Sequence, residues 1–148
     1  MATNIRNIEP SDYRKGAVEL LAQLTSIDKT GVTEEKFRVY VETLTQNPFH
    51  KTVVVEATGQ IVGIGTVYIE PKLIHNMGYV GHIEDIVTDK EYRNQHIGKA
   101  IITHLSDYAR MMGCYKTILD CAENNVCFYE KCGYKKHGIE MSQYYYHN

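Results

Sequence analysis

Several side chains capable of proton transfer lie inside stretches whose pattern is otherwise that of strands or a helix. Glu84 and Asp85 interrupt a largely apolar run, and Asp120 lies near the end of another. Tyr129 falls in a short helical stretch. Carboxylates are depleted in strands, yet they are groups that can accept a proton from an amine nucleophile. From the residues alone two interpretations stay open: a solvated sheet face, or a polar site for acid–base chemistry.

Two of these positions depend on local geometry. Adjacent residues of a regular strand point to opposite faces, so Glu84 and Asp85 can share a site only if a bulge re-aims one of them. Tyr129 follows Phe128, and this pair can equally form the apolar face of a short helix. The spacing of the residues leaves these alternatives open.

A second candidate site is the passage from strand to turn to helix over 82–100. A helix N-terminus presents unpaired backbone N–H groups and a favourable dipole, so this passage can hold a pyrophosphate. Gly98 permits close approach of the backbone, and Arg93 and Lys99 add positive charge. A P-loop would need glycine at Arg93 and Ser or Thr at Ala100. A dinucleotide fingerprint would need three glycines where this turn has one. Both alternatives are excluded.

The elements that position these residues alternate along the chain. Strands are predicted at 3–8, 53–55, 61–69, 78–87, 115–121 and 134–146, and helices at 10–24, 33–47, 97–112 and 124–131. The helix over 97–112 has apolar residues at three- and four-residue steps, and Gly113 ends it. Thr33 is a hydroxyl N-cap for the second helix. The order indicates one α/β domain over 1–148 with a mixed sheet.

Composition restricts the possible partners. The 148 residues carry a formal net charge of −2, with 43% hydrophobic and 23% charged residues, which is ordinary for a globular protein. The charge favours no nucleic-acid partner, and no apolar run suits a membrane helix or secretory signal. The histidines show no metal-ligand spacing, and none of the four cysteines forms a CxxC pair. We therefore expect no metal and a reduced, cytoplasmic protein.

The turn Gln95-x-x-Gly98-x-Ala100 resembles the acyl-CoA loop of the GNAT superfamily, where it follows the fourth strand and opens the third helix. More specific motifs are similar to those of the glucosamine-6-phosphate N-acetyltransferase family. They are Gly81-His82-Ile83-Glu84-Asp85-Ile86, Gly113-Cys114-Tyr115-Lys116, Leu119-Asp120-Cys121, Asn125 and Phe128-Tyr129-Glu130-Lys131-Cys132-Gly133. The motifs lie between Gly81 and Gly133, and several separate motifs in order are hard to obtain by chance.

The resemblance implies a GNAT fold, mostly antiparallel with a splayed central parallel pair, and roles for named residues. Catalytic roles fall on the Ile86 amide, which polarises the thioester carbonyl, on Tyr129, whose hydroxyl approaches the sulfur, and on Glu84 and Asp120. Acetyl-CoA contacts fall on Ile86, Val87, Thr88, Asn94, Gln95, His96, Ile97, Gly98, Lys99, Asn125, Tyr129, Glu130 and Lys131. Sugar contacts fall on Thr25, Lys72, Leu73, Ile74, His75, Glu84, Asp85, Tyr115, Lys116 and Asp120.

The resemblance further implies direct transfer of acetyl from acetyl-CoA to the amine of glucosamine 6-phosphate, and a homodimer with exchanged C-terminal strands. The chain departs from the family in two places. Tyr144 aligns with an arginine that reaches the substrate phosphate, and tyrosine supplies no positive charge. Asn94 and His96 stand where glycines are frequent. Two other functions stay open: a GNAT enzyme for another small or protein amine, and a non-catalytic acyl-CoA-binding sensor.

Overall fold

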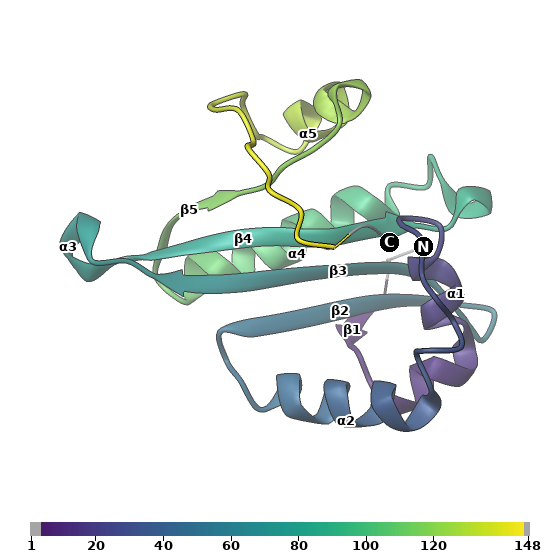
Figure 1. Ribbon diagram of the computed structural model, residues 1–148. Helices are drawn as coiled ribbons and strands as arrows, with labels where there is room; N and C mark the ends of the chain where they lie inside the picture. Colours follow the sequence, from purple (N-terminus) through teal and green to yellow (C-terminus); the bar gives the residue numbers. More distant parts are fainter. Residues whose placement is uncertain (1–3, 147–148) are drawn as a thin grey trace.

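The strands form one mixed sheet in the order β1-β2-β3-β4-β5 (Figure 1). The computed structural model describes residues 4–146, so Thr3, where the first predicted strand begins, lies outside the described residues. The strands are β1 (Ile5–Asn7), β2 (His50–Ala57), β3 (Gln60–Pro71), β4 (Tyr79–Thr88) and β5 (Cys114–Ile118). Neighbours from β1 to β4 run antiparallel, whereas β4 and β5 run parallel. The predicted mixed sheet is confirmed.

The helical segment predicted after Pro10 is divided into two short helices. Pro10–Lys15 forms the 3-10 helix η1, and Ala17–Leu21 forms α1. Between them Gly16 has φ +84°, a left-handed conformation that glycine adopts at little steric cost. The prediction missed this break because Pro10, Ser11 and Asp12 marked a helix start, whereas the apolar repeat of residues 17, 20, 21 and 24 lies wholly after Gly16.

Helix α2 (Glu34–Thr45) begins at the predicted hydroxyl cap. The Thr33 side chain accepts a 3.3 Å hydrogen bond from the backbone N–H of Lys36, and Glu34 and Glu35 in the first turn complement the helix dipole. The helix ends before Asn47-Pro48, close to the predicted boundary.

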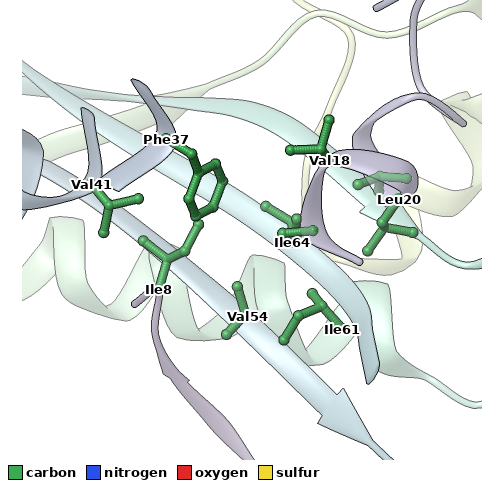
Figure 2. Close-up of a cluster of buried hydrophobic side chains, with 10 residues drawn as sticks. Ile8, Val18, Leu20, Phe37, Val41, Val54, Ile61 and Ile64 are labelled. Carbon is green, nitrogen blue, oxygen red and sulfur yellow. The ribbon is translucent and has the colours of Figure 1, made fainter. Parts of the chain in front are cut away.

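Helices α1 and α2 cover one face of the sheet. Their buried side chains pack against Val54 of β2 and against Ile61 and Ile64 of β3. Ile64 points toward Val18 (Figure 2). The labelled members of this cluster are Ile8, Val18, Leu20, Phe37, Val41, Val54, Ile61 and Ile64. Full burial of one such side chain contributes about 1.5–3 kcal/mol relative to exposure. This layer fixes β2 and β3 from one side.

Helix α4 (Ile97–Met111) covers the opposite face. Its fully buried Ile101, Leu105 and Ala109 pack against the side of the sheet that carries Val53. A Cβ on Gly65 would lie 2.5 Å from Ile101 Cγ2, so glycine lets α4 approach β3 closely. The periodic helix predicted over 97–112 is confirmed, and Gly113 beyond it has φ +86°.

The chain after α4 is less regular than the sequence predicted. Strand β5 stops at Ile118, before Asp120 and Cys121. Glu123–Asn125 forms the 3-10 helix η3, and Val126–Lys131 forms α5. The strand predicted over 134–146 is absent from this stretch, which carries no regular element. A strand needs a partner along its edge, and the tail pairs with none of the described strands.

The tail leaves apolar side chains in solvent. Ile139 and Met141 are each 93% exposed, and Tyr144, Tyr145 and Tyr146 are 79–85% exposed. No helix among residues 4–146 is both long and apolar enough to cross a bilayer.

Candidate active site

A β-bulge interrupts β4 at the two acids. Ile64 of β3 pairs with Val87, and Thr66 pairs with Glu84, so Asp85 and Ile86 together oppose the single residue Gly65. Asp85 has φ +53°, which is uncommon for a residue other than glycine and is typical of a bulge that turns a side chain away from its regular direction. The bulge that Glu84 and Asp85 required is therefore present.

The parallel pair β4–β5 separates immediately before the bulge. Its register runs from Tyr79 opposite Cys114 to His82 opposite Ile118. Strand β4 continues to Thr88, but its last six residues have no strand partner on the β5 side within residues 4–146. This separation is the expected splay, and the bulge lies inside it.

The loop before α4 presents a run of free backbone donors. Within the described residues, the N–H groups of 93–99 donate to no acceptor, and the first amide of this region that is bonded is Ala100, to His96 O at 2.9 Å. His96 is the N-cap of α4 and its side chain makes no capping hydrogen bond. Unpaired amides at a helix N-terminus attract anionic oxygens. The loop therefore has the donors that a pyrophosphate needs.

Two residues of this loop have left-handed backbones, Asn94 at φ +65° and His96 at φ +62°. At these two positions glycines are frequent in the family that the loop resembles. The structure places both residues in the left-handed conformation that glycine adopts at little cost. Gly98 itself lies against α5, since a Cβ there would stand 3.2 Å from the Phe128 ring and 3.4 Å from Thr88 Oγ1. Its small size serves the packing of α5 on the loop.

Tyr129 lies on α5 beside this loop, half-buried. Its ring contacts Phe128 at 5.1 Å and Tyr134 at 6.3 Å between centroids. Burial, then the nearby thiols Cys121 and Cys132, raises the pKa of the Tyr129 hydroxyl, which stays protonated at neutral pH. No group among residues 4–146 hydrogen-bonds to it. A protonated, uncommitted hydroxyl can donate to a developing thiolate.

The two acids at the bulge, Glu84 and Asp85, lie in different surroundings. The pKa of Glu84 is raised, first by partial desolvation of its carboxylate at the surface and next by the charge of Asp85, with Asp120 adding to the effect and His82 opposing it. The charges of two other carboxylates thus act on Glu84. Glu140 of the tail also raises the pKa of Glu84, which places the tail near the bulge. A carboxylate with a raised pKa is a better proton acceptor than an ordinary one.

Asp85 faces the α2 side of the sheet. It lines a cavity of about 440 Å³ between α2 and β2, together with Tyr40 and His50. The charge of Asp85 contributes to the raised pKa of Tyr40 and opposes the burial that lowers the pKa of His50. Asp85 alone of the predicted sugar contacts lines this cavity, whose remaining wall is mostly apolar.

A second group of predicted sugar contacts lies at the far end of β4. Here α3 (Ile74–Met77) contains left-handed residues, with His75 at φ +52° and Asn76 at φ +57°. The His75 ring stacks on Tyr115 at 4.2 Å, and Lys116 Nζ lies 5.8 Å from that ring centre. The β3–β4 connection is thereby held against the start of β5.

Lys72 at this end already has an anionic partner. Its ammonium donates to Glu70 Oε1 at 3.0 Å, and His82 Nε2 lies 2.7 Å from Glu70 Oε2. These contacts, the His82 bond first, lower the pKa of Glu70. The sequence did not single out Glu70 or His82 for a role, because the pairing depends on strand register. The alternation of His82 and Glu84 along β4 was the available signal.

The structure brings together only part of the predicted site. Glu84 lies at the bulge within reach of the charge of Asp120, and Asp85 turns from the bulge into the cavity on the α2 side. Residues 72–75 and 115–116 lie together at the other end of β4. Thr25 lies exposed in the connection between α1 and α2, and Leu73 and Ile74 are 91% and 60% exposed. Asn125, Glu130 and Lys131 are exposed around α5. This region lies near the acyl-CoA loop, since the charge of Lys99 opposes the burial that raises the pKa of Cys132.

A bulged and splayed strand beside a helix N-terminus with free amides is the arrangement that the resemblance implied. A family model described as the Acetyltransferase (GNAT) family matches residues 17–134. The chain belongs to the GNAT acetyltransferase family. GNAT acetyltransferases use acetyl-CoA, and the unbonded amides of 93–99 fit its pyrophosphate.

Individual GNAT relatives are similar over almost the whole chain. The glucosamine 6-phosphate N-acetyltransferase of Arabidopsis thaliana is 44% identical over 144 residues, covering 95% of each chain. That of Candida albicans is 39% identical over 138 residues, covering 92% of this chain and 91% of its own. The crystal structure of glucosamine-6-phosphate N-acetyltransferase from Arabidopsis thaliana matches with a TM-score of 0.93 and 42% identity, covering 98% and 99% of the two chains.

Proposed function

We propose that this GNAT acetyltransferase transfers the acetyl group of acetyl-CoA to the amine of glucosamine 6-phosphate, giving N-acetylglucosamine 6-phosphate and CoA. The observation that carries the proposal is the bulge at Asp85 and Ile86, which lies where β4 and β5 splay apart. It is supported by Glu84 next to the bulge, whose pKa is raised by partial desolvation and by the charges of Asp85 and Asp120. A polyhydroxylated amine suits such a group of carboxylates, which accept hydrogen bonds from hydroxyl and ammonium groups alike. Relatives named for this reaction at 39–44% identity support the choice of substrate.

The donor end of the site consists of backbone groups. The amides of 93–99 hold the pyrophosphate, with Lys99 adding positive charge. The Ile86 amide, at the bulge, donates to the thioester oxygen as negative charge develops there. One such preorganised donor is worth roughly 10²–10³ in rate. This role needs the bulge, because a regular ladder would commit the amides of β4 to β3.

Proton transfer is assigned to two side chains. Glu84 receives the proton of the attacking amine, directly or through water, since its raised pKa brings it nearer to the pKa of an amine. Tyr129 donates to the departing thiolate, since its own raised pKa keeps the hydroxyl protonated. Asp120 and Asp85 orient the sugar, and their negative charges help to keep the pKa of Glu84 raised.

Transfer is direct, without an acetyl-cysteine. Burial raises the pKa of the Cys114 and Cys132 thiols, which disfavours the thiolate that such an intermediate requires. None of the four cysteines has a hydrogen-bonded histidine within the described part of the chain. The free thiols also support a reducing compartment, the cytoplasm. The product would feed UDP-N-acetylglucosamine synthesis.

The phosphate contacts of the proposed site are incomplete in one copy of the chain. Lys72 is engaged by Glu70, Lys116 and His75 lie at the far end of β4, and Tyr144 supplies no charge. We propose that the protein is a homodimer in which each C-terminal tail pairs with the sheet of the other copy. The exposed Ile139, Met141 and tyrosines of the tail support this, because such a patch gains from burial.

The decisive experiment measures free-thiol release from acetyl-CoA with a panel of amines. Glucosamine 6-phosphate should give turnover at least about tenfold above glucosamine, spermidine and a peptide N-terminus. Turnover with another amine but not with the sugar phosphate would replace this substrate within the same family. Acetyl-CoA binding without turnover on any amine would favour a non-catalytic sensor.

A further inference from the structure

Gln23 joins the two sides of the proposed active site through its side-chain amide. Its Nε2 donates to Asp89 Oδ2 at 2.9 Å, and its Oε1 accepts from the backbone N–H of Lys90 at 3.1 Å. Both ends of the amide are thus used, and the two contacts fix its orientation. Gln23 follows α1 and stands two residues before Thr25, a predicted sugar contact. Asp89 follows β4 and leads into the acyl-CoA loop.

The turn from Asp89 to Tyr92, which accepts the contacts of Gln23, is fixed by hydrogen bonds of its own. Asp89 N–H donates to Val62 O at 2.9 Å, its carboxylate accepts from Glu91 N–H at 2.8 Å, and its carbonyl accepts from Tyr92 N–H at 2.9 Å. The hydrogen bonds from Glu91, first, and from Gln23 lower the pKa of Asp89, so it is a carboxylate at neutral pH. A displacement of Gln23 therefore acts on a hydrogen-bonded turn that directly precedes residues 93–99.

The connection that carries Gln23 has few backbone hydrogen bonds; its other anchors are the packing of Ile27 and Val32 on the core and the bond from the Tyr13 hydroxyl to Val32 O. Between α1 and α2 the backbone bonds of the last helical turn reach Thr25, and the next one is Gly31 N–H to Asp28 O. Within residues 4–146, no other hydrogen bond or ion pair joins this connection to the acyl-CoA loop. The side chain of Gln23 is exposed, so it contributes little to the core.

We propose that Gln23 is a positioning residue that couples the acceptor side of the site to the acyl-CoA loop. Ordering of the loop by acetyl-CoA restrains the turn at Asp89 and, through Gln23, the connection that carries Thr25. The acceptor then binds to a connection that is already restrained, so each substrate raises the affinity for the other by the same factor. The inference rests on the proposed function, because it takes glucosamine 6-phosphate as the acceptor.

The coupling is measurable without turnover. Coenzyme A and glucosamine 6-phosphate form a ternary complex that cannot react, because no acetyl group is present. Calorimetry gives the Kd of the sugar phosphate alone and at saturating coenzyme A, and the ratio is the coupling factor. We expect coenzyme A to tighten sugar binding in the wild type. Gln23→Leu should bring the factor toward one, a loss of roughly three- to tenfold.

A matched control separates coupling from surface stability. Arg14→Leu also removes two exposed side-chain hydrogen bonds, those to Glu34 at 2.7 and 3.4 Å, but they join η1 to α2 and touch neither segment. Arg14→Leu should retain the wild-type coupling factor. An unchanged factor in Gln23→Leu, an equal loss in both variants, or a wild-type factor of one would overturn the proposal.

A rescue tests the bond itself. Gln23→Glu alone sets two carboxylates together and should lose coupling. Combined with Asp89→Asn it exchanges donor and acceptor, and the new amide can still accept from Glu91 N–H, so coupling should return. Absence of rescue would count against the bond. If wild-type protein fails to acetylate glucosamine 6-phosphate, the proposed function fails, and the same factors measured with the amine found by the panel decide the role of Gln23.

Discussion

The middle of the sheet and its open end at β5 are built in opposite ways. Every residue of β3 from Ile61 to Val67 is buried, between α1 and α2 on one side and α4 on the other. In contrast, neither β5 nor α5 contains a buried residue. The candidate chemistry lies at this second, open end and at the bulge of β4 that borders it. Stability and reactivity are therefore separable here: changes at the open end should alter rate, and changes in the buried layers should alter the free energy of unfolding.

The largest expected effect breaks the chemistry and leaves the fold intact. Glu84→Gln removes the proposed proton acceptor, and kcat should fall roughly 10²–10³-fold. Glu84 is exposed at the edge of the splay, so the midpoint of thermal unfolding should change little. A steady-state rate and a melting curve on the same sample test both statements. A large loss of stability would show that Glu84 stabilises the fold, which contradicts its assignment to the chemistry alone.

The pH dependence sharpens the assignment. Glu84 acts as a carboxylate, so kcat/KM should fall as the pH drops through its pKa, and the raised pKa places this fall above the range of an ordinary Glu. Asp85→Asn removes one cause of the raised pKa and tolerates the left-handed backbone. The acid limb should then move to lower pH, whatever happens to affinity. An unmoved limb would assign it to another group.

The sequence predicted the buried middle of the molecule more completely than its open end at β5. The helix over 97–112 and the cap at Thr33 follow from local periodicity and local hydrogen bonding, and both are present. The strand over 134–146 is absent because strand formation depends on a partner, which a local pattern does not contain. Gly16 separates the helix start at Pro10 from the apolar repeat that begins at Ala17, and the local pattern does not show that two helices form instead of one.

The same distinction applies to the candidate site. The bulge and the loop were predicted because motifs mark them. The His82–Glu70–Lys72 contacts and the Gln23–Asp89 bond were not, because they join residues that are neighbours only after the strands pair and the helices pack. Lys72 illustrates the consequence: its charge suits a phosphate, but the fold also gives it a carboxylate.

Tyr129 and Tyr134, at α5 and just after it, offer a test with an effect of intermediate size. Their rings lie 6.3 Å apart, yet the Tyr134 hydroxyl bonds to Ser106 Oγ and Thr117 Oγ1, each at 2.9 Å, whereas that of Tyr129 is uncommitted. Tyr129→Phe should lower kcat roughly 10- to 100-fold with an unfolding free energy within about 0.5 kcal/mol of wild type.

Tyr134→Phe is the matched control and should behave in the reverse way. Loss of its hydroxyl leaves two half-buried groups without their partner, which costs about 1–2 kcal/mol, while kcat should stay within about twofold of the wild-type value. Urea unfolding and single-turnover kinetics measure the two quantities. Equal effects on rate from both substitutions would contradict the separation of stability from reactivity, since the Tyr134 hydroxyl bonds to Ser106 and Thr117 and that of Tyr129 has no partner among residues 4–146.

The smallest expected effect concerns strain in the acyl-CoA loop. His96 holds a left-handed backbone at the N-cap of α4 without a capping hydrogen bond, and that conformation costs roughly 1–2 kcal/mol for a residue with a Cβ. His96→Gly removes the cost but gains flexibility in the unfolded chain, so stability should rise by at most about 1 kcal/mol. The KM for acetyl-CoA should change less than about threefold, because the donors are backbone amides. Thr103→Gly, in the exposed middle of α4, should instead lose about 0.5 kcal/mol. Equal destabilisation by both substitutions would mean that the loop carries no strain, and that histidine suits this position as well as glycine does.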